Sequence, residues 1–429
     1  MGQSGVEWIG DVPEGWKRGH LKYFVQAIQD GTHGTYDRVD NGVPLLSAKN
    51  IGSGRLIVSE NESLVSELDA KEILSSGFPR KGDVLFSCVG SIGKVCMFDR
   101  DEPLPFQRSA AFIRPSSITD GRFLMYALSS DYVVRQAEAN QNKSAQAGIY
   151  LGQIGLFEIV LPPISEQIRI VGLLDAEIEE IDAAIDSVMQ QCGILERYKS
   201  SLIHEAVTKG LDRDVPMRPS GVEWIGNIPE GWRALRGKYV FSMYGGSISE
   251  DHLFLEDRPG LKEIVYLKVS NLNNSTNGFE IDEYPTCYTD LAIEQFSTPL
   301  ILIPKRGMAI QTNKVRISNR PCLIDPNLMA IRTEGNIRYY AYVLQCINLI
   351  NIADVTTIPQ INNKHLNELR LPVPSASEQK RIVDFLDDRC ARIDRILDLK
   401  RRQVDVLRRR RQSLIYEYVT GKRRVNQGA

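Results

Sequence analysis

Apolar residues recur at alternating intervals of three and four along two long segments of the chain. The first segment runs from Ser165 to Gly210 and the second from Ser377 to Gly421. Intervals of this kind mark the seam of a coiled coil. About 45 residues of helix span about 67 Å. The pattern therefore predicts two long helices, and because a single exposed apolar seam would aggregate, we expect them to pack on each other as an intramolecular antiparallel coiled coil.

The predicted contact surface consists of the large apolar residues of both seams. These are Val171, Leu174, Ile178, Ile181, Ile185, Val188, Leu195 and Leu202 in the first segment and Val383, Leu386, Ile393, Leu397, Val404, Leu407 and Leu414 in the second. Lys199 and Arg411 occupy one equivalent seam slot, which indicates either a helix-to-helix register contact or cations that reach solvent. Prolines precede each segment, a glycine ends it, and Ser165 and Ser377 are the predicted N-caps.

The two helices belong to an internal repeat. The segment SGVEWIGDVPEGW at residues 4–16 returns as SGVEWIGNIPEGW at residues 220–232, and Glu166 and Glu378 open the two helices 212 positions apart. A repeat of this length has to be recognised before a fold is proposed. Each half consists of an opening segment, a globular stretch and one long helix. Trp8, Trp16, Trp224 and Trp232 of the opening segments are predicted to anchor the chain in a core rather than to stack on bases.

Between the opening segments and the helices, the two halves diverge. Both show short β-type runs separated by turns, followed by one helix near residues 120–140 or 336–348. We therefore predict an α+β protein in which two α/β domains are joined by the two long helices with pseudo-twofold symmetry. The predicted boundaries are 1–160 for the first domain, 161–210 for the first helix, 211–370 for the second domain with its linker 211–219, 371–421 for the second helix and 422–429 for the C-terminal tail.

The composition changes this picture little. The chain has 429 residues, of which 42% are hydrophobic and 25% charged, and its length suggests two to four domains. It shows no run of about 18 apolar residues and no basic-then-apolar leader, and its seven cysteines form no C-x-x-C pair, so we expect a cytoplasmic protein with reduced thiols. The net charge of −2 conceals basic and acidic runs, and it neither establishes nor excludes binding to DNA.

The repeated motifs resemble one protein family over essentially the whole chain. The SGVEWIG-x-x-PEGW opening, the helix starts LPPISEQIRIV and LPVPSASEQKRIV and the helix ends SLI-x-E-x-VT are similar to those of the specificity (S) subunit of type I restriction-modification enzymes. The resemblance implies that each globular domain is a target recognition domain that reads one half of a split, asymmetric DNA sequence. It also implies that the paired helices act as a spacer and as a docking surface for two modification subunits.

The same resemblance assigns the chemistry to partners. The modification subunits methylate adenine with S-adenosylmethionine, and restriction subunits that use ATP and Mg²⁺ can join to cleave DNA. For this chain we therefore expect no catalytic residue, no cofactor and no metal. A self-sufficient DNA methyltransferase or nuclease, and a coiled-coil adaptor without DNA specificity, are the alternatives.

The residues of this chain also favour catalysis by partner subunits. Asp325-Pro326-Asn327-Leu328 lacks the second proline and the aromatic residue of the loop with which an adenine methyltransferase grips its target. The glycines of GSIGKV at residues 90–95 stand too close together for a phosphate loop, and the five histidines have no metal-ligand spacing.

Turns after the predicted strands carry groups that bind phosphates and base edges. Exposed amides, hydroxyls and cations contact phosphate, whereas Asn and Gln pair with adenine. A solvated surface turn is the alternative for each. The DNA-binding candidates are Ser47, Lys49, Asn50, Ser87, Gly90, Ser91, Lys94, Asn142, Lys143, Lys268, Ser270, Asn271, Lys305, Arg306, Gln311, Asn313, Lys314, Thr356 and Thr357.

Overall fold

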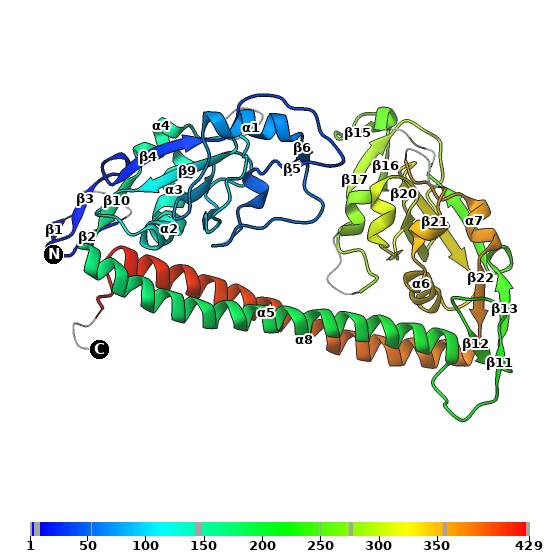
Figure 1. Cartoon of the computed structure of the whole chain (residues 1–429). Helices are drawn as coiled ribbons and strands as arrows, with labels where there is room; N and C mark the ends of the chain where they lie inside the picture. The colour runs from blue at the N-terminus through cyan, green and yellow to red at the C-terminus, as the bar shows by residue number, and fades with distance from the viewer. Residues whose placement is uncertain are drawn as a thin grey trace. The chain divides into compact units, whose positions relative to one another are not determined.

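The structure is a computed structural model that describes residues 2–3, 9–52, 54–141, 148–246, 248, 250–273, 278–354 and 358–425 (Figure 1). The chain forms two compact units. Unit 1 contains residues 1–188 and 402–429, and unit 2 contains residues 189–401. The division crosses both long helices, so each unit holds the start of one helix and the end of the other. We call the part of each unit outside these helices its head.

Head 1 is built on a four-stranded antiparallel sheet with the strand order β4-β9-β7-β8. Helix α2 packs on strands β7, β8 and β9 of this sheet. Two ribbons, β1-β2 and β3-β10, and the small sheet β5-β6 complete the head. Its elements are β1 (Gly2–Gln3), β2 (Asp11–Val12), β3 (Lys17–His20), η1 (Leu21–Tyr23), β4 (Val25–Asp30), β5 (Val43–Pro44), η2 (Ala48–Asn50), β6 (Leu64–Val65), α1 (Glu67–Ser76), β7 (Val84–Ser87), β8 (Val95–Met97), β9 (Ala110–Pro115), α2 (Gly121–Ser129), α3 (Asp131–Ala139), α4 (Leu151–Gly155) and β10 (Glu158–Leu161).

Head 2 repeats this sheet as β14-β21-β18-β19, with helix α6 packed on β18, β19 and β21. It adds a second four-stranded sheet, β15-β17-β16-β20, and the ribbons β11-β12 and β13-β22. Its elements are β11 (Met217–Pro219), β12 (Asn227–Pro229), β13 (Arg233–Arg236), η3 (Gly237–Tyr239), β14 (Phe241–Gly245), η4 (Glu250–His252), β15 (Leu253–Phe254), β16 (Lys262–Leu267), η5 (Val269–Asn273), β17 (Thr286–Thr289), β18 (Leu300–Pro304), η6 (Met308–Thr312), β19 (Arg316–Ser318), β20 (Leu323–Ile324), β21 (Leu328–Thr333), α6 (Ile337–Cys346), η7 (Leu349–Ile352), α7 (Asn363–Glu368) and β22 (Arg370–Val373).

The expectation of one helix near residues 120–140 is wrong, because the chain breaks at Ser130 into α2 and α3. The backbone of Ser130 is extended, with φ −78° and ψ 150°, and its hydroxyl donates to the carbonyl of Ala127 at 2.7 Å. A serine that bonds its own preceding turn competes with the helical hydrogen-bond ladder. In head 2 the corresponding helix α6 is a single element, as expected.

The two long helices are α5 (Ile164–Lys209) and α8 (Ala376–Val419). Gly210 and Gly421 follow them in the left-handed backbone region, with φ of +78° and +73°, which is the usual helix end. The predicted N-caps are wrong, because both helices begin before Ser165 and Ser377. The cap of α8 is Ser375, whose Oγ accepts from the Glu378 amide at 3.3 Å while the Glu378 carboxylate accepts from the Ser375 amide at 3.1 Å.

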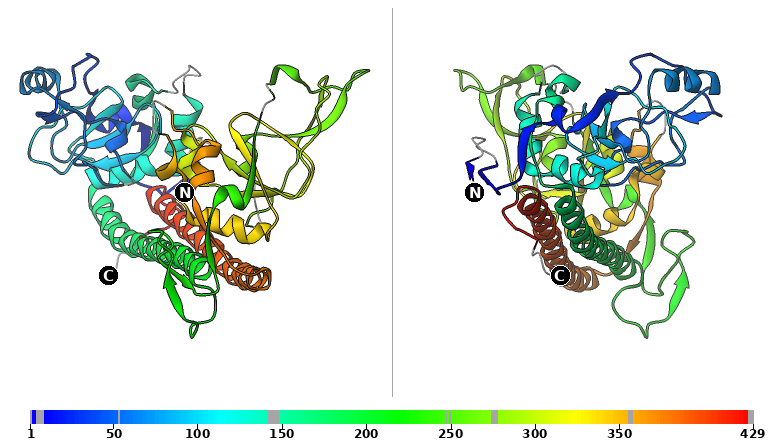
Figure 2. Two further views of the ribbon diagram at one scale, coloured as in Figure 1. Left: turned by 90° about the vertical axis from the view of Figure 1, so that its right-hand side faces the viewer. Right: turned by 60° about the vertical axis from the view of Figure 1, so that its left-hand side comes forward.

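The long helices pair in antiparallel fashion within each unit (Figures 1 and 2). In unit 2, Glu196 of α5 meets Arg401 of α8, and Lys199, one turn later on α5, meets the earlier Asp394 on α8. In unit 1, Asp182 of α5 pairs with Arg411 of α8. The predicted intramolecular antiparallel coiled coil is therefore confirmed.

The predicted seam residues lie along this pairing. Ile185, Leu195, Leu202 and Leu407 are half-buried. Those that are less than a tenth exposed are Val171, Leu174, Ile178, Ile181, Val188, Val383, Leu386, Ile393, Leu397, Val404 and Leu414. Towards the helix ends the seam merges with the core of each head, since Val171 and Leu174 belong to one buried cluster with Phe123 of α2. The helices thus form one continuous core with each head.

A tryptophan joins the opening segment of each unit to a helix start. The Trp16 Nε1 donates to Glu166 Oε2 at 3.0 Å in unit 1, and the Trp232 Nε1 donates to Glu378 Oε1 at 2.9 Å in unit 2. The rings also lie against the glycine that ends the other long helix, since a Cβ on Gly210 would stand 3.2 Å from the Trp232 ring. Each opening segment therefore holds a helix start and a helix end together.

A second contact, which we call the anchor aspartate, fastens each head to its long helix. In unit 1, Asp175 of α5 accepts from the Tyr126 hydroxyl at 2.7 Å and pairs with Arg122 at 3.0 Å. In unit 2, Asp387 of α8 accepts from the Tyr342 hydroxyl at 2.7 Å and from Arg338 at 2.9 Å. The two aspartates are 212 positions apart and the tyrosines 216. The repeated sequence frame therefore makes the same side-chain contacts twice.

Candidate nucleic-acid interface

One edge of the main sheet gathers the polar turns in each head. In head 1, β4 and β7 end where β9 begins, because Asp30 pairs with Ala111 and Ser87 with Ala110. In head 2, β14 and β18 end where β21 begins, with Gly245 opposite Met329. The turns that leave this edge carry most of the candidate DNA-binding residues. We call it the turn edge.

Close backbone packing requires glycine at the same point of both turn edges. A Cβ on Gly31, directly after β4, would lie 2.1 Å from the carbonyl oxygen of Phe106, and a Cβ on Gly246, directly after β14, would lie 2.0 Å from that of Asp325. Real side chains never approach backbone atoms this closely, so both positions need a residue without a side chain. The two heads therefore share this backbone packing at the turn edge as well as the contacts that fasten each head to its long helix.

The turn after β7 places three of the head 1 candidates on the surface. Gly90, Ser91 and Lys94 are exposed. Ser87 is fully buried, and its hydroxyl donates to the Ser91 carbonyl at 2.6 Å and accepts from the Lys94 amide at 2.8 Å. Ser87 thus shapes the turn, whereas the exposed residues have the geometry to approach a phosphate.

The second head 1 cluster, η2, is held by a buried amide. Asn50 is 2% exposed, and its side chain accepts from the Ser47 amide at 2.9 Å and donates to the Ile57 carbonyl at 2.9 Å. These bonds leave its amide facing the protein interior. The half-buried Ser47 and the exposed Lys49 present the outer surface of this turn.

Lys49 also forms an ion pair with Glu62, a carboxylate that is almost completely buried. Its Nζ lies 2.7 Å from Glu62 Oε2, and the Glu62 side chain is only 5% exposed. The hydrogen bond from Lys49 lowers the pKa of Glu62 from 4.5 to about 2, against the opposing effect of burial and with help from Ser59 and Asn50. Glu62 therefore remains ionised and offsets part of the Lys49 charge.

Sequence reasoning missed the cleft that these turns surround. It has a volume of about 1070 Å³ and is lined by Asp30 at the end of β4, by Thr32 and His33 after that strand, by Arg108 before β9 and by Tyr150. His33 Nε2 lies 2.8 Å from Asp30 Oδ2. The candidate turns border it, because the Ala48 amide donates to Ser109 Oγ at 3.0 Å and Val89 pairs with Gly148. The polar run DGTHGT at residues 30–35, which begins at the last residue of β4, was the signal that could have revealed it.

The turn edge of head 2 carries two adjacent cations. Lys305 and Arg306 directly follow β18, and the Lys305 amide donates to the Asn327 carbonyl at 2.7 Å. Arg306 is exposed and pairs through its backbone with Gln360. The two cations therefore lie beside the start of β21, at the edge where Asp30 and Arg108 lie in head 1.

The η5 candidates repeat the design of η2. The Asn271 side chain accepts from the Lys268 amide at 2.7 Å, as Asn50 does from Ser47 in head 1. Asp325, next to β21, donates its amide to the Leu267 carbonyl at 3.0 Å, which places η5 at the turn edge. Ser270 is the most exposed of the three candidates in this turn.

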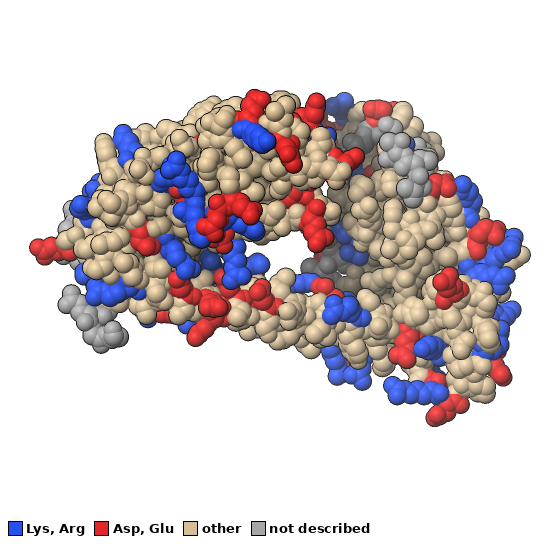
Figure 3. Space-filling model, viewed as in Figure 1, with Lys and Arg blue, Asp and Glu red and all other residues tan. Residues whose placement is uncertain are grey.

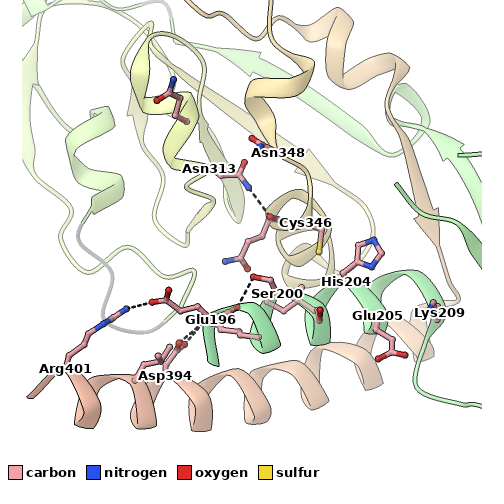
Figure 4. Close-up of a pocket in the computed structure, with 16 residues that line it drawn as sticks. Glu196, Ser200, His204, Glu205, Lys209, Asn313, Cys346, Asn348, Asp394 and Arg401 are labelled. Atoms are coloured by element: carbon pink, nitrogen blue, oxygen red, sulfur yellow. Dashed lines mark hydrogen bonds and ion pairs between the residues drawn. The ribbon is translucent and has the colours of Figure 1, made fainter. Parts of the chain in front are cut away.

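Three further candidates of head 2 lie at η6. Gln311 and Asn313 line a cleft of about 980 Å³ whose other walls are α6, α5 and α8 of the same unit (Figure 4). Asn313 Nδ2 donates to the Gln345 carbonyl at 2.9 Å, and Lys314 donates to Asn273. Gln311 and Asn313 therefore share a cleft with the long helices, whereas Lys314 contacts the end of η5.

Four candidates, Asn142, Lys143, Thr356 and Thr357, lie outside the described residues.

Positive and negative side chains are interspersed on the heads and form no large patch of one sign on the face shown. Figure 3 shows Lys and Arg interspersed with Asp and Glu over the visible face. A uniform basic field would give binding without sequence preference, so any DNA preference has to come from local groups. Burial raises the pKa of the Cys88 and Cys96 thiols to about 12, which leaves both thiols protonated and unreactive.

The parts of the chain that the structure describes contain no group of three or more His, Cys, Asp or Glu residues arranged to hold a metal ion. Among the same residues, no helix combines the length and the apolar character that a bilayer crossing requires.

Comparisons with known proteins agree on one family. The model of the type I restriction modification DNA specificity domain matches residues 13–188 and 263–403. The chain is 24% identical to the putative type I restriction enzyme MjaX specificity subunit of Methanocaldococcus jannaschii, over 97% of this chain and 96% of that protein. It is 22% identical to the MjaVIII specificity subunit of the same organism, over 62% of each. In fold it is similar to a chain from a solved type I R-M system, with a TM-score of 0.70, 18% identity, and coverage of 96% and 100%.

Proposed function

Because the chain belongs to the type I restriction modification DNA specificity family, we propose that it selects a bipartite, asymmetric DNA target through the turn edges of its two heads. The observation that carries this proposal is that the same tryptophan and aspartate contacts hold two heads whose turn edges carry different side chains. The anchor aspartates Asp175 and Asp387 make the same bonds in both units. Two heads that are fixed to the helices by the same contacts but expose different side chains are suited to bind two different half-sites.

The groups at each edge indicate how the half-sites would be read. Arg108 in the head 1 cleft suits the two acceptors of guanine in the major groove, and the carboxylate of Asp30 suits the amino group of cytosine. Lys305 and Arg306 of head 2 suit phosphate contacts or a guanine. Head 1 therefore offers a carboxylate and a guanidinium in one cleft, whereas head 2 offers two adjacent cations.

We further propose that the chemistry is delegated to partner subunits. Two modification subunits would supply S-adenosylmethionine and transfer the methyl group to adenine, and restriction subunits, where present, would supply ATP and Mg²⁺. This chain would be non-catalytic, in keeping with the incomplete adenine-gripping string at Asp325 to Leu328. A stacked adenine has to leave the duplex for such chemistry, so the role of this chain is to place the partners on the DNA.

Exposed apolar side chains on the helices support the docking of two such partners. Ile194 of α5 is 56% exposed and Val406 of α8 is 54% exposed. The two residues are 212 positions apart and therefore occupy the same place in the repeat. Large apolar groups repeated on the solvent side of a coiled coil suit two copies of one partner.

Exchange of one head tests the proposal. Residues 17–160 would be replaced by the matching residues of a relative, and the methylated sites of the assembled complex would be mapped. We expect one half-site to change and the other to stay. A change in both half-sites would contradict independent heads, and methylation without any sequence preference would favour the adaptor alternative.

A further inference from the structure

Each head exposes one lysine and one tyrosine at the same place in the repeat, and we call these the Lys–Tyr pairs. The pair of head 1 is Lys22 and Tyr23 in η1, and the pair of head 2 is Lys238 and Tyr239 in η3. The lysine Nζ lies 5.2 Å from the centre of the tyrosine ring in head 1 and 5.1 Å in head 2. The pairs are 216 positions apart, as are the two opening segments, so they are copies of one surface feature.

The backbone presents both pairs in the same way. The residue before each turn is extended, with φ of −70° in head 1 and −66° in head 2 and ψ of 143° in both. The amide of Leu21 donates to the Phe157 carbonyl at 2.8 Å, and the amide of Gly237 donates to the Leu369 carbonyl at 2.7 Å. These bonds tie each turn to the chain just before β10 or β22, so both turns have one fixed orientation.

The lysine and the tyrosine are kept where their neighbours differ. Residues 17–21 differ from residues 233–237 at every position, and residues 24–26 differ from residues 240–242 at every position. The backbone of these turns therefore tolerates many side chains. The identity of the two exposed residues has to be explained by what their side chains contact.

No contact within the described parts of the chain explains this identity. Tyr23 is 66% exposed and Tyr239 is 70% exposed. Among the described residues, neither tyrosine hydroxyl has a hydrogen-bond partner and neither lysine of the pairs has a carboxylate partner. An exposed cation–π contact between neighbours adds little to the stability of a fold. A partner outside the chain accounts for the same two side chains in both heads.

The Lys–Tyr pairs lie away from the turn edges. One residue separates η1 from β4 and η3 from β14, and both strands run from these turns to the turn edge of their head. The strands have six and five residues, which span about 17–20 Å. The pairs are therefore at the opposite ends of these strands from the turns that are proposed to contact DNA, and they are free for a different partner.

Exposed cations surround both pairs. The ribbon β3-β10 and η1 carry three exposed Lys or Arg residues and one carboxylate, Glu158, and the ribbon β13-β22 and η3 carry four cations and no carboxylate (Figure 1). The cations are Lys17, Arg18 and Lys22 in head 1 and Arg233, Arg236, Lys238 and Arg370 in head 2. Glu158 lies 3.5 Å from Arg18, and Glu368 of α7 lies 3.5 Å from Arg236. Both surfaces keep unpaired positive charge beside the exposed ring, which suits an acidic partner.

We propose that the Lys–Tyr pairs are docking sites for the two modification subunits, and that each pair binds an acidic segment of one subunit. This inference rests on the proposed function, in which two such subunits join the chain. One surface presented twice suits two copies of one partner, and tyrosine is enriched among the residues that dominate the binding energy of protein interfaces. The pairs add a contact on each head to the contacts proposed for the long helices.

The test measures how many modification subunits the full chain binds. Lys22→Glu with Tyr23→Ala removes the pair of head 1, and Lys238→Glu with Tyr239→Ala removes the pair of head 2. In a titration followed by native mass spectrometry, wild type should bind two subunits. Each double variant should bind one of the two at least tenfold more weakly and the other as wild type does, and the combination of all four changes should weaken both.

The charge of the partner is tested by salt. Raising the ionic strength from about 0.1 to 1 M shortens the screening length from about 10 to 3 Å. The affinity of wild type for the modification subunits should fall over this range. Lys22→Glu with Lys238→Glu should reduce this salt dependence, whereas Lys22→Arg with Lys238→Arg should preserve it. A salt dependence that is the same in all three proteins would contradict an acidic partner.

Head 2 also provides a matched control. The Arg320 guanidinium lies 5.0 Å from the centre of the Tyr284 ring, but the corresponding positions of head 1 hold Leu104 and Leu68. Arg320→Glu with Tyr284→Leu therefore removes a cation–π pair that is not repeated. This variant should bind two modification subunits as wild type does, and circular dichroism should show that all variants keep the wild-type fold, because the Lys–Tyr pairs are exposed.

Two results would overturn the inference. The first is wild-type affinity for both modification subunits in the variant that lacks both pairs. The second is intact assembly combined with weaker binding of DNA, which would assign the pairs to phosphate groups. If wild type itself binds no modification subunit, the proposed function fails instead.

Discussion

Trp232 offers a direct test of the repeated frame. Its indole is 1% exposed and lies where the opening segment of unit 2, the end of α5 and the start of α8 meet. The Nε1 donates to Glu378 Oε1 at 2.9 Å, and the ring contacts Gly210 at the end of α5. Two substitutions separate these contributions, because Trp232→Phe keeps an aromatic ring but removes the donor, whereas Trp232→Ala removes both.

The expected magnitudes follow from these contacts. A hydrogen bond to a charged group is worth about 1.5–3 kcal/mol, and Glu378 is only half-buried, so Trp232→Phe should lower the free energy of unfolding of unit 2 by about 2 kcal/mol. Truncation of a buried aromatic side chain costs about 3–5 kcal/mol. Trp232→Ala should therefore cost about 5 kcal/mol.

The stability lost in Trp232→Phe should depend on pH. Burial raises the pKa of Glu378, but hydrogen bonds from Ser375 and Trp232 outweigh it, so the pKa lies below its ordinary value of 4.5. A carboxylate with a depressed folded-state pKa contributes stability above its unfolded pKa and loses it as the pH falls through the folded value. Trp232→Phe removes one of these hydrogen bonds. The difference between wild type and variant should therefore shrink once the pH falls below 4.5.

Urea unfolding followed by circular dichroism, at neutral pH and at a pH below 4.5, measures these differences. Trp224→Phe is the matched control. Trp224 lies in the same opening segment and is half-buried, but its Nε1 has no hydrogen-bond partner among the described residues. If Trp232→Phe costs no more than Trp224→Phe, or if its cost does not depend on pH, the indole-to-carboxylate bond does not stabilise the frame.

Three further predictions concern the heads. Lys49 holds the pKa of Glu62 at about 2, so Glu62→Gln should destabilise head 1 by up to about 3 kcal/mol at neutral pH. This loss of stability should vanish as the pH falls from 4.5 to about 2. A difference in urea midpoint between wild type and variant that does not change with pH would refute this. Lys305→Ala with Arg306→Ala should weaken DNA binding at every sequence and reduce the salt slope by up to about 2, measured by fluorescence anisotropy; an unchanged slope argues against phosphate contacts. Arg108→Ala should relax the preference at one base pair of one half-site by about 1–3 kcal/mol; in competition binding, an equal loss for all sequences would indicate a phosphate contact instead.

The frame was predictable from sequence because its signals are local or repeated. Heptad intervals revealed both long helices and their seam residues, and the displaced motifs revealed two halves. The cap of α8 was also within reach, since Ser375 and Glu378 form the S-x-x-E pattern of a capping box. Ser165 and Ser377, the predicted caps, lie just inside the two helices, and Pro163 occupies the place before α5 that corresponds to Ser375.

The contacts that depend on pairing were not predictable. A heptad pattern identifies the slots of Lys199 and Arg411 but not their partners, because a partner depends on the register of a second helix. The head 1 cleft depends in the same way on sheet register, which brings Arg108 and Asp30 into one cleft although 78 positions separate them. Which of the candidate residues contact DNA stays a prediction.

The most direct test of the account is a map of methylated adenines in DNA treated with the complex of this chain and its modification subunits. The account predicts one bipartite motif with two different half-sites and a constant spacer, because two unlike turn edges are carried on one repeated frame. A palindromic motif, a continuous motif or methylation at scattered sites would contradict it.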